Sequence, residues 1–214
     1  MENNSVSVQA LQRMPIYLEY LKTLPSTASA SISASAIAEA LGLCHSQVRK
    51  DLAAVSGGGK PKVGYIRECL VEDMEAFLGC TEIKRAVVVG MGTLGRFMMD
   101  CDEFAGYGMH VVAGFEPDQT DEENMVGTKY VFPMEKLRLL CSRVKIHVGI
   151  ITVPARQAQQ VCDLLIECGV MAIWNFTPVA LQAPEDVLVY NQSLASSLSV
   201  LSTHITRVVG QNAV

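Results

Sequence analysis

The sequence predicts an α/β protein in which a winged helix-turn-helix domain precedes a doubly wound Rossmann domain. Three observations support this fold class. Two short helical patterns meet at Gly42, and a glycine-rich basic stretch follows them. An apolar run then enters a Gly-x-Gly-x-x-Gly turn, made of Gly90, Met91, Gly92, Thr93, Leu94 and Gly95. From Arg85 onward, apolar runs of strand length alternate with helical patterns.

The chain is expected to divide into four stretches. These are a frayed N-terminus over residues 1–12, the winged helix with a linker helix over 13–82, the Rossmann domain over 83–191 and a last helix over 192–214. The first helix is expected to begin at Pro15, because proline suits a first helical turn, and to stop at Pro25. The small polar residues after Pro25 predict a loop, in which Ser33 or Ser35 would cap the second helix.

Composition narrows the classes of protein that fit. A net charge of −5 argues against indiscriminate nucleic-acid binding. No apolar run is long enough to cross a membrane and the N-terminus lacks a signal-peptide pattern, so a cytoplasmic protein without membrane association is expected. The seven cysteines contain no Cys-x-x-Cys pair, which favours reduced, mostly buried thiols and no metal site. A redox-active Cys101 or a metal site is the alternative.

The second and third helical patterns have helix-turn-helix spacing. Apolar residues of the third helix would face inward, which leaves a polar face made of Ser46, Gln47, Arg49 and Lys50. The stretch SGGGKPKVGY over residues 56–65 would form the wing, a β-hairpin whose tip carries Lys60 and Lys62. The alternative is a small helical bundle with a solvated Arg-Lys pair and a flexible loop.

Basic residues are concentrated in this same region. Residues 45–67 hold five basic side chains and one acid, although the whole chain is acidic. An anionic polymer should therefore contact this segment, which predicts double-stranded DNA as the partner.

The glycine turn predicts a dinucleotide site. Gly90 would permit the tight bend, Gly92 would let a pyrophosphate approach the backbone and Gly95 would let the next helix pack closely. Glu116 ends the second predicted strand, 21 residues beyond Gly95, where an acid accepts hydrogen bonds from an adenosine ribose and repels a 2′-phosphate. The pattern favours NAD(H) over NADP(H). A degenerate or CoA-type site is the alternative.

Two later stretches follow the carboxyl ends of predicted strands, where ligands of such sheets bind. They are Thr152-Val153-Pro154 and Asn175-Phe176, and each is equally compatible with a plain strand-to-helix turn. The sequence contains no Tyr-x-x-x-Lys dyad, and no His–Asp pair is evident near the predicted nicotinamide end, so an enzyme is not expected. An NAD-dependent enzyme with a fused helical domain is the rival hypothesis.

The last helix has a narrow apolar seam with alternating spacings of four and three. It consists of Leu194, Leu198, Leu201, Ile205 and Val208. Such a seam would pack on the chain's own sheet or on a partner subunit. A homodimer suits a DNA reader, because two recognition helices one turn apart can read a palindrome.

This domain order resembles the Rex family of redox-sensing transcriptional repressors. The matching stretches are residues 47–52 (QVRKDL), 59–60 with 63–65, the glycine turn, 152–155, and 175–176 with 178–179. The resemblance implies a homodimer with a domain-swapped last helix, which binds operator palindromes and releases them when NADH binds. It also implies DNA contacts by Arg49, Lys50 and Lys60. The glycines and Glu116 would hold the dinucleotide, and the 152–154 and 175–176 stretches would border the nicotinamide.

Several positions depart from the family pattern. Cys101 stands where the family often has a tyrosine linked to the NADH switch, and Ser193 and Glu19 stand at the places of its Asp and Arg partners. The coupling between cofactor and DNA release is therefore expected to be absent or rewired. A paralogue that answers another ligand or thiol oxidation is the alternative function. Pro61-Lys62 and Ala54-Val55 also differ from the family, which predicts a shifted operator preference.

Overall fold

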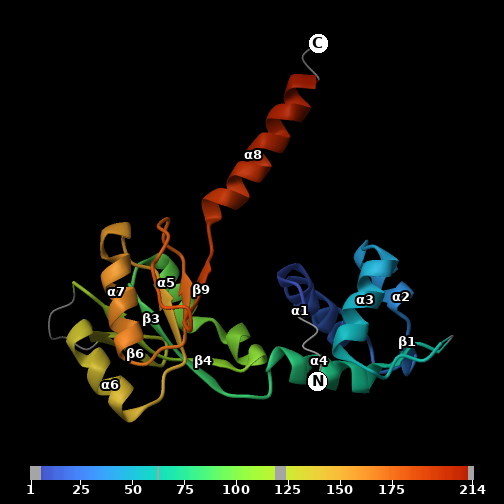
Figure 1. The fold of residues 1–214 in the computed structure, drawn as a ribbon, viewed down its shortest axis with the longest axis horizontal. Coiled ribbons are helices and arrows are strands. Elements are labelled where there is room, and N and C mark those ends of the chain that lie inside the picture. The colour runs from blue at the N-terminus through green and yellow to red at the C-terminus, as the bar shows by residue number, and fades with distance from the viewer. Residues whose placement is uncertain (1–5, 62, 119–123, 212–214) are drawn as a thin grey trace. The chain divides into compact units, whose positions relative to one another are not determined.

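The computed structural model describes residues 6–61, 63–118 and 124–211. It divides into two compact units, Met1–Glu82 and Ile83–Val214, which are described separately (Figure 1). The described elements of the first unit are α1 (Val8–Thr23), β1 (Ser31–Ile32), α2 (Ala34–Leu41), α3 (His45–Val55), β2 (Tyr65–Ile66) and α4 (Arg67–Leu78).

Helix α1 begins at Val8, so the expectation of a frayed stretch through residue 12 is wrong for residues 8–12. The Ser7 hydroxyl accepts a hydrogen bond from the Ala10 N–H at 3.3 Å and caps the helix. Pro15 lies inside α1 and not at its start. Its missing N–H removes one helical bond, which the burial of apolar neighbours such as Met14 and Leu18 offsets.

The helix-turn-helix follows the predicted pattern. The Ser33 hydroxyl caps α2 by accepting from the Ala36 N–H at 3.0 Å, and Gly42 ends the helix in the left-handed conformation with φ 65°. The core of this unit packs α1, α2, α3 and α4 together. Its largest fully buried side chains are Tyr17, Met14, Leu21, Ile37, Leu52, Leu70 and Met74.

The wing differs from the predicted hairpin. Strand β2 pairs antiparallel with β1, which lies in the stretch expected to be a loop. Lys60 and Gly64 form only an isolated bridge at the tip, and Lys62 lies outside the described residues. A two-residue strand among serines is too short to show alternation along the sequence. Its hydrogen bonds come from a partner strand far along the chain, so no local pattern predicts it.

The second unit is built on a seven-stranded sheet of order β5-β6-β4-β3-β7-β8-β9. The strands are β3 (Lys84–Val89), β4 (Met109–Glu116), β5 (Asn124–Val126), β6 (Lys129–Pro133), β7 (Val148–Ile151), β8 (Ala172–Asn175) and β9 (Leu188–Asn191). All neighbours are parallel except β5 and β6, and the unpredicted β5 is a short, largely exposed edge strand. Strand order reverses at β3, which is where such sheets bind ligands.

Helices cover both faces of this sheet. They are α5 (Thr93–Asp100), α6 (Leu137–Arg143) and α7 (Ala155–Glu167), with 3-10 helices η1 (Asp102–Tyr107) and η2 (Met134–Lys136), and a further helix, α8 (Leu194–Gln211), follows β9. Side chains of β3 alternate between the two layers, so Val87 packs with the α6 and α7 side while Val88 packs with the α5 side. The helix predicted over 94–103 ends at Asp100, because Cys101 is extended and η1 follows.

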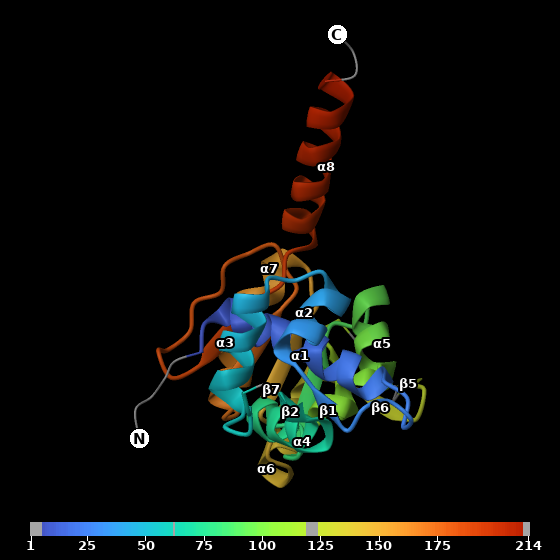
Figure 2. The same ribbon diagram turned by 90° about the vertical axis from the view of Figure 1, so that its right-hand side faces the viewer.

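Helix α8 is the exception to this packing. Every side chain described between Ala195 and Val209 is exposed. Figures 1 and 2 show α8 as one continuous helix with no strand or other helix of the second unit along its sides. Within the part of the chain that the structure describes, no helix combines the length and apolar character that a membrane crossing needs.

Candidate functional site

The glycine turn between β3 and α5 is shaped by close backbone contacts. Gly90 has φ 102°, and a Cβ atom there would lie 2.8 Å from the Thr152 carbonyl group. A Cβ atom on Gly95 would lie 1.8 Å from the Gly90 carbonyl oxygen, so this glycine lets α5 pack against the turn. Gly92 is different, because a Cβ atom there would meet nothing within 4 Å. The N-terminus of α5 is therefore open to a ligand at Gly92, which fits an approaching phosphate.

Two side chains hold this turn from either side. The Glu116 carboxylate, at the end of β4, accepts a hydrogen bond from the Met91 N–H at 2.6 Å. Arg96 donates from Nε to the Met91 carbonyl oxygen at 3.0 Å. Glu116 is half-buried and keeps its second carboxylate oxygen for another donor, which suits a ribose hydroxyl.

The residues after β7 support the same turn. The Thr152 hydroxyl lies within hydrogen-bonding distance of the Val89 and Gly90 carbonyl oxygens, at 3.0 and 2.8 Å. Val153 is buried, while exposed Pro154 precedes the first turn of α7. Thr152 is thus joined to the glycine turn.

Asn175 and Phe176 extend this edge beyond β8. The fully buried Asn175 amide donates to the Val179 carbonyl and to Asn191, both at 2.8 Å, so it shapes the loop. The Phe176 N–H donates to the Ile151 carbonyl at 3.0 Å, and its ring lies 4.8 Å from that of Trp174. The two residues therefore lie at the predicted edge, with Asn175 in a supporting position.

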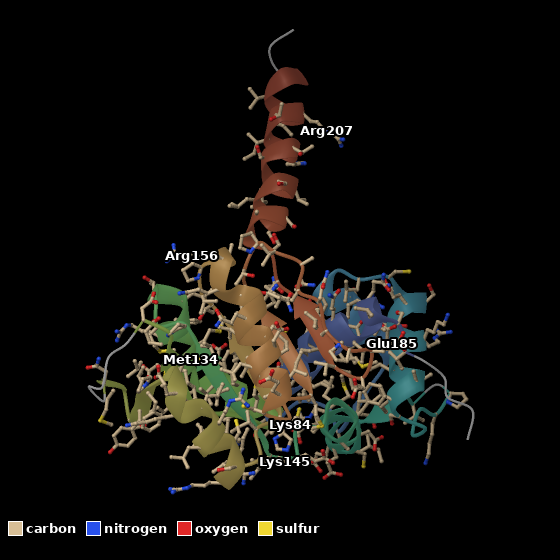
Figure 3. The ribbon with its side chains drawn as sticks, turned by 60° about the vertical axis from the view of Figure 1, so that its left-hand side comes forward. Lys84, Met134, Lys145, Arg156, Glu185 and Arg207 are labelled. Carbon is tan, nitrogen blue, oxygen red and sulfur yellow. The ribbon has the colours of Figure 1, made fainter. Side chains whose placement is uncertain are left out.

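Basic side chains lie at both ends of the sheet, but only one end holds the glycine turn. Arg156 lies exposed in the first turn of α7, on the side of the glycine turn. Figure 3 shows Lys84 and Lys145 together at the far end, where the strands begin. Only Arg156 of these three is placed to attract a phosphate to the carboxyl edge.

Helix α3 exposes the polar face that the sequence predicted. Ser46, Gln47, Arg49 and Lys50 are exposed, whereas Val48 and Leu52 are buried. Arg49 and Lys60 meet at one hollow of about 570 Å³, together with Ser33, Ser35 and Tyr65. Two of the predicted DNA contacts therefore line one surface between α2, α3 and the wing.

Cys44 precedes α3 and is exposed. Its thiol lies 3.2 Å from the Ser46 hydroxyl. The hydrogen bond with Ser46, followed by those from backbone N–H groups of α3, lowers the pKa of the Cys44 thiol.

The sequence did not reveal a buried ionic cluster behind this face. Asp51 is only 6 % exposed, and Arg13 of α1 donates to both of its oxygens, at 2.9 and 3.0 Å. The Tyr17 hydroxyl donates to the same carboxylate at 2.9 Å. Two features of the sequence could have indicated this cluster. Arg13 and Tyr17 are four residues apart on one helix, and Asp51 is the single acid in a basic helix.

The three positions expected to take part in switching lie in separate elements. Glu19 is exposed on α1 of the first unit. Cys101 is half-buried between α5 and η1, and the Ser193 hydroxyl accepts from the Ser196 N–H at 3.2 Å at the start of α8. The expectation that the coupling linkage of the family is absent or rewired at these positions stays a prediction.

Known proteins share both halves of this arrangement. Residues 5–53 match the family model "Putative DNA-binding protein N-terminus", and residues 81–179 match "CoA binding domain". The crystal structure of RSP in complex with beta-NAD+ and operator DNA has a TM-score of 0.89 and 29 % identity, covering 97 % of this chain and 96 % of that one. The structure of RSP in complex with beta-NADH has a TM-score of 0.84 and 28 % identity, covering 98 % and 99 % of the two chains.

Sequence relatives agree with these structures. The redox-sensing transcriptional repressor Rex of Porphyromonas gingivalis is 35 % identical over 93 % of this chain and 91 % of its own length. The Rex protein of Treponema denticola is 34 % identical over 90 % and 91 % of the two chains. The resemblance found in the motifs is thus confirmed, and this chain belongs to the Rex family of redox-sensing transcriptional repressors.

Proposed function

We propose that this chain is a homodimeric repressor that binds palindromic operator DNA and releases it when NADH binds. One observation carries the proposal: a single chain of this family presents an exposed basic recognition helix and an open glycine turn of the dinucleotide type. RSP, a structural neighbour, has been crystallised with operator DNA and with each form of the cofactor. The same two ligands are therefore assigned to this chain.

The DNA surface is assigned to α3 and the wing. Arg49 and Lys60 line one hollow, where phosphate contacts would fix the register of the protein on the duplex. Exposed Gln47 and Lys50 would face base edges in the major groove. Lys62 is assigned to the wing from the sequence alone.

The dinucleotide is assigned to the carboxyl edge around β3. Its pyrophosphate would approach Gly92, and the free oxygen of Glu116 would accept from the adenosine ribose. The nicotinamide would lie toward Phe176. A bound dinucleotide would serve as a signal for the redox state, since the rest of the chain offers a DNA reader in place of a substrate domain.

The dimer is assigned to α8. Leu198, Leu201 and Ile205 are each at least 60 % exposed along one side of this helix. An apolar seam whose described side chains are exposed indicates a partner surface. The swapped arrangement implied by the family would supply that cover.

The test is DNA selection and binding. The wild-type protein should enrich palindromic sequences from random duplexes, and its affinity should fall steeply with salt because basic residues release counterions. Lys50→Ala should weaken the selected site far more than random DNA. Equal, salt-sensitive binding to all duplexes would refute the proposal. If instead peroxide but not NADH releases the DNA, and Cys101→Ser abolishes that response, the thiol-sensing alternative holds.

A further inference from the structure

The recognition helix is tied to α1 through the Arg13 guanidinium. One edge of this group donates to the Asp51 carboxylate, with an Nη2–Oδ2 separation of 2.8 Å. Tyr17 is fully buried beside it and donates to the same carboxylate. Burial, and then the Asp51 hydrogen bond, raise the pKa of the Tyr17 phenol, so the hydroxyl keeps its proton and its donor role. Arg13 is therefore held in one orientation.

The other edge of the same guanidinium faces Gln47. With its amide oxygen turned inward, Gln47 accepts hydrogen bonds from Arg13 Nη1 at 3.0 Å and Nη2 at 3.2 Å. The opposite orientation would set the amide nitrogen against guanidinium N–H groups, donor against donor. Both lone pairs of the amide oxygen are thereby occupied, while the exposed side chain keeps its NH₂ group for another partner.

We infer that Arg13 is a positioning residue that restricts Gln47 to reading DNA as a hydrogen-bond donor, and so selects guanine at the base it contacts. This inference rests on the proposed function, in which α3 enters the major groove. A free glutamine pairs bidentately with adenine, because its oxygen accepts from the N6 amino group while its NH₂ donates to N7. The Gln47 amide oxygen cannot accept from adenine while it accepts from Arg13.

The chemistry of the base edges then decides the preference. Guanine presents two adjacent acceptors, O6 and N7, to the two hydrogens of the Gln47 NH₂ group. Adenine presents one acceptor beside an amino donor, which would face the Gln47 donor unfavourably. A single contact of this quality discriminates by about 5- to 100-fold between base pairs.

The test selects binding sites from a random duplex library with the full-length wild type, Gln47→Ala and Arg13→Lys. The position at which Gln47→Ala loses its preference is the Gln47 position. The wild type should select a G·C pair there by about 5- to 100-fold over A·T. Arg13→Lys keeps a positive charge beside Asp51 but lacks the planar fork, so the released amide should now accept an A·T pair at that position alone. Thermal unfolding of Arg13→Lys reports whether it is folded.

A second readout does not depend on the Arg13 variant. Replacing the selected guanine by 2-aminopurine removes the O6 acceptor, which should weaken binding of the wild type and leave Gln47→Ala unaffected. Selection of A·T at the Gln47 position by the wild type would overturn the inference, as would a folded Arg13→Lys that keeps the G·C preference. A wild type without any sequence preference would instead overturn the proposed function itself.

Discussion

At the scale of single residues, the first unit depends on Asp51, an acid in an otherwise basic helix. Its carboxylate is buried and accepts from both Arg13 and Tyr17. Asp51→Asn should lower the free energy of unfolding by about 2 kcal/mol, because the half-buried Arg13 guanidinium loses its counter-charge. Tyr17→Phe should cost about 1.5 kcal/mol, since it removes one hydrogen bond to a charged group.

Urea unfolding at a fixed protein concentration measures both changes. Glu19→Gln on the exposed side of α1 is the control and should change the free energy little. If Asp51→Asn costs no more than this control, the cluster around Asp51 does not stabilise the unit.

Two cysteines should differ sharply in reactivity. Hydrogen bonding to Ser46 lowers the pKa of exposed Cys44, whereas burial, followed by the neighbouring Cys168, raises the pKa of Cys141 to about 11. The thiolate is the reactive form, so iodoacetamide at pH 8 should modify Cys44 faster than Cys141. Peptide mass spectrometry over time measures the two rates. The two rates should converge in urea, where both thiols are exposed to solvent. Equal rates in the folded protein would contradict the opposite pKa shifts of Cys44 and Cys141.

At the scale of elements, the turn between β3 and α5 separates two roles of glycine. Gly95→Ala should disrupt the second unit, because the new Cβ would lie 1.8 Å from the Gly90 carbonyl oxygen. Gly92→Ala should leave the fold intact, because the new Cβ would meet no packed neighbour within 4 Å, but it should weaken dinucleotide binding.

Circular dichroism reports the fold of both variants. Energy transfer from Trp174, the one tryptophan of the chain, reports binding of NADH near Phe176. The assignment of Gly92 to the approach of the phosphate would be contradicted if Gly92→Ala unfolded the protein. It would also be contradicted if the folded variant bound NADH as tightly as the wild type.

The sequence predicted the elements whose patterns are local. The apolar run into Gly90 and the caps at Ser33 and Gly42 depend on residues close in sequence. Pro15 misplaced the start of α1, because the true cap at Ser7 lies in a stretch without clear periodicity. Strand β1 and the Asp51 cluster were missed because their partners lie more than 30 residues away.

At the scale of the whole molecule, α8 is the proposed interface of the homodimer. Leu201→Glu with Ile205→Glu should yield a monomer, because these side chains are exposed within the chain and would face a partner. Thr203→Glu, on another side of the same helix, is the matched control. Analytical ultracentrifugation measures the change, and a dimer that survives the double substitution would assign the interface elsewhere. The monomer should also lose most of its affinity for a palindrome, since two linked half-sites bind together.

The central claim is that the dinucleotide controls DNA binding, even though Glu19, Cys101 and Ser193 are predicted to stand at the positions that the family uses for coupling. The most direct test measures affinity for the selected operator by fluorescence anisotropy, at constant total dinucleotide and varying NADH:NAD⁺ ratio. We expect the affinity for DNA to fall by about tenfold or more as the NADH share rises. Affinity that stays constant across the ratio, while Trp174 energy transfer shows NADH bound, would contradict it.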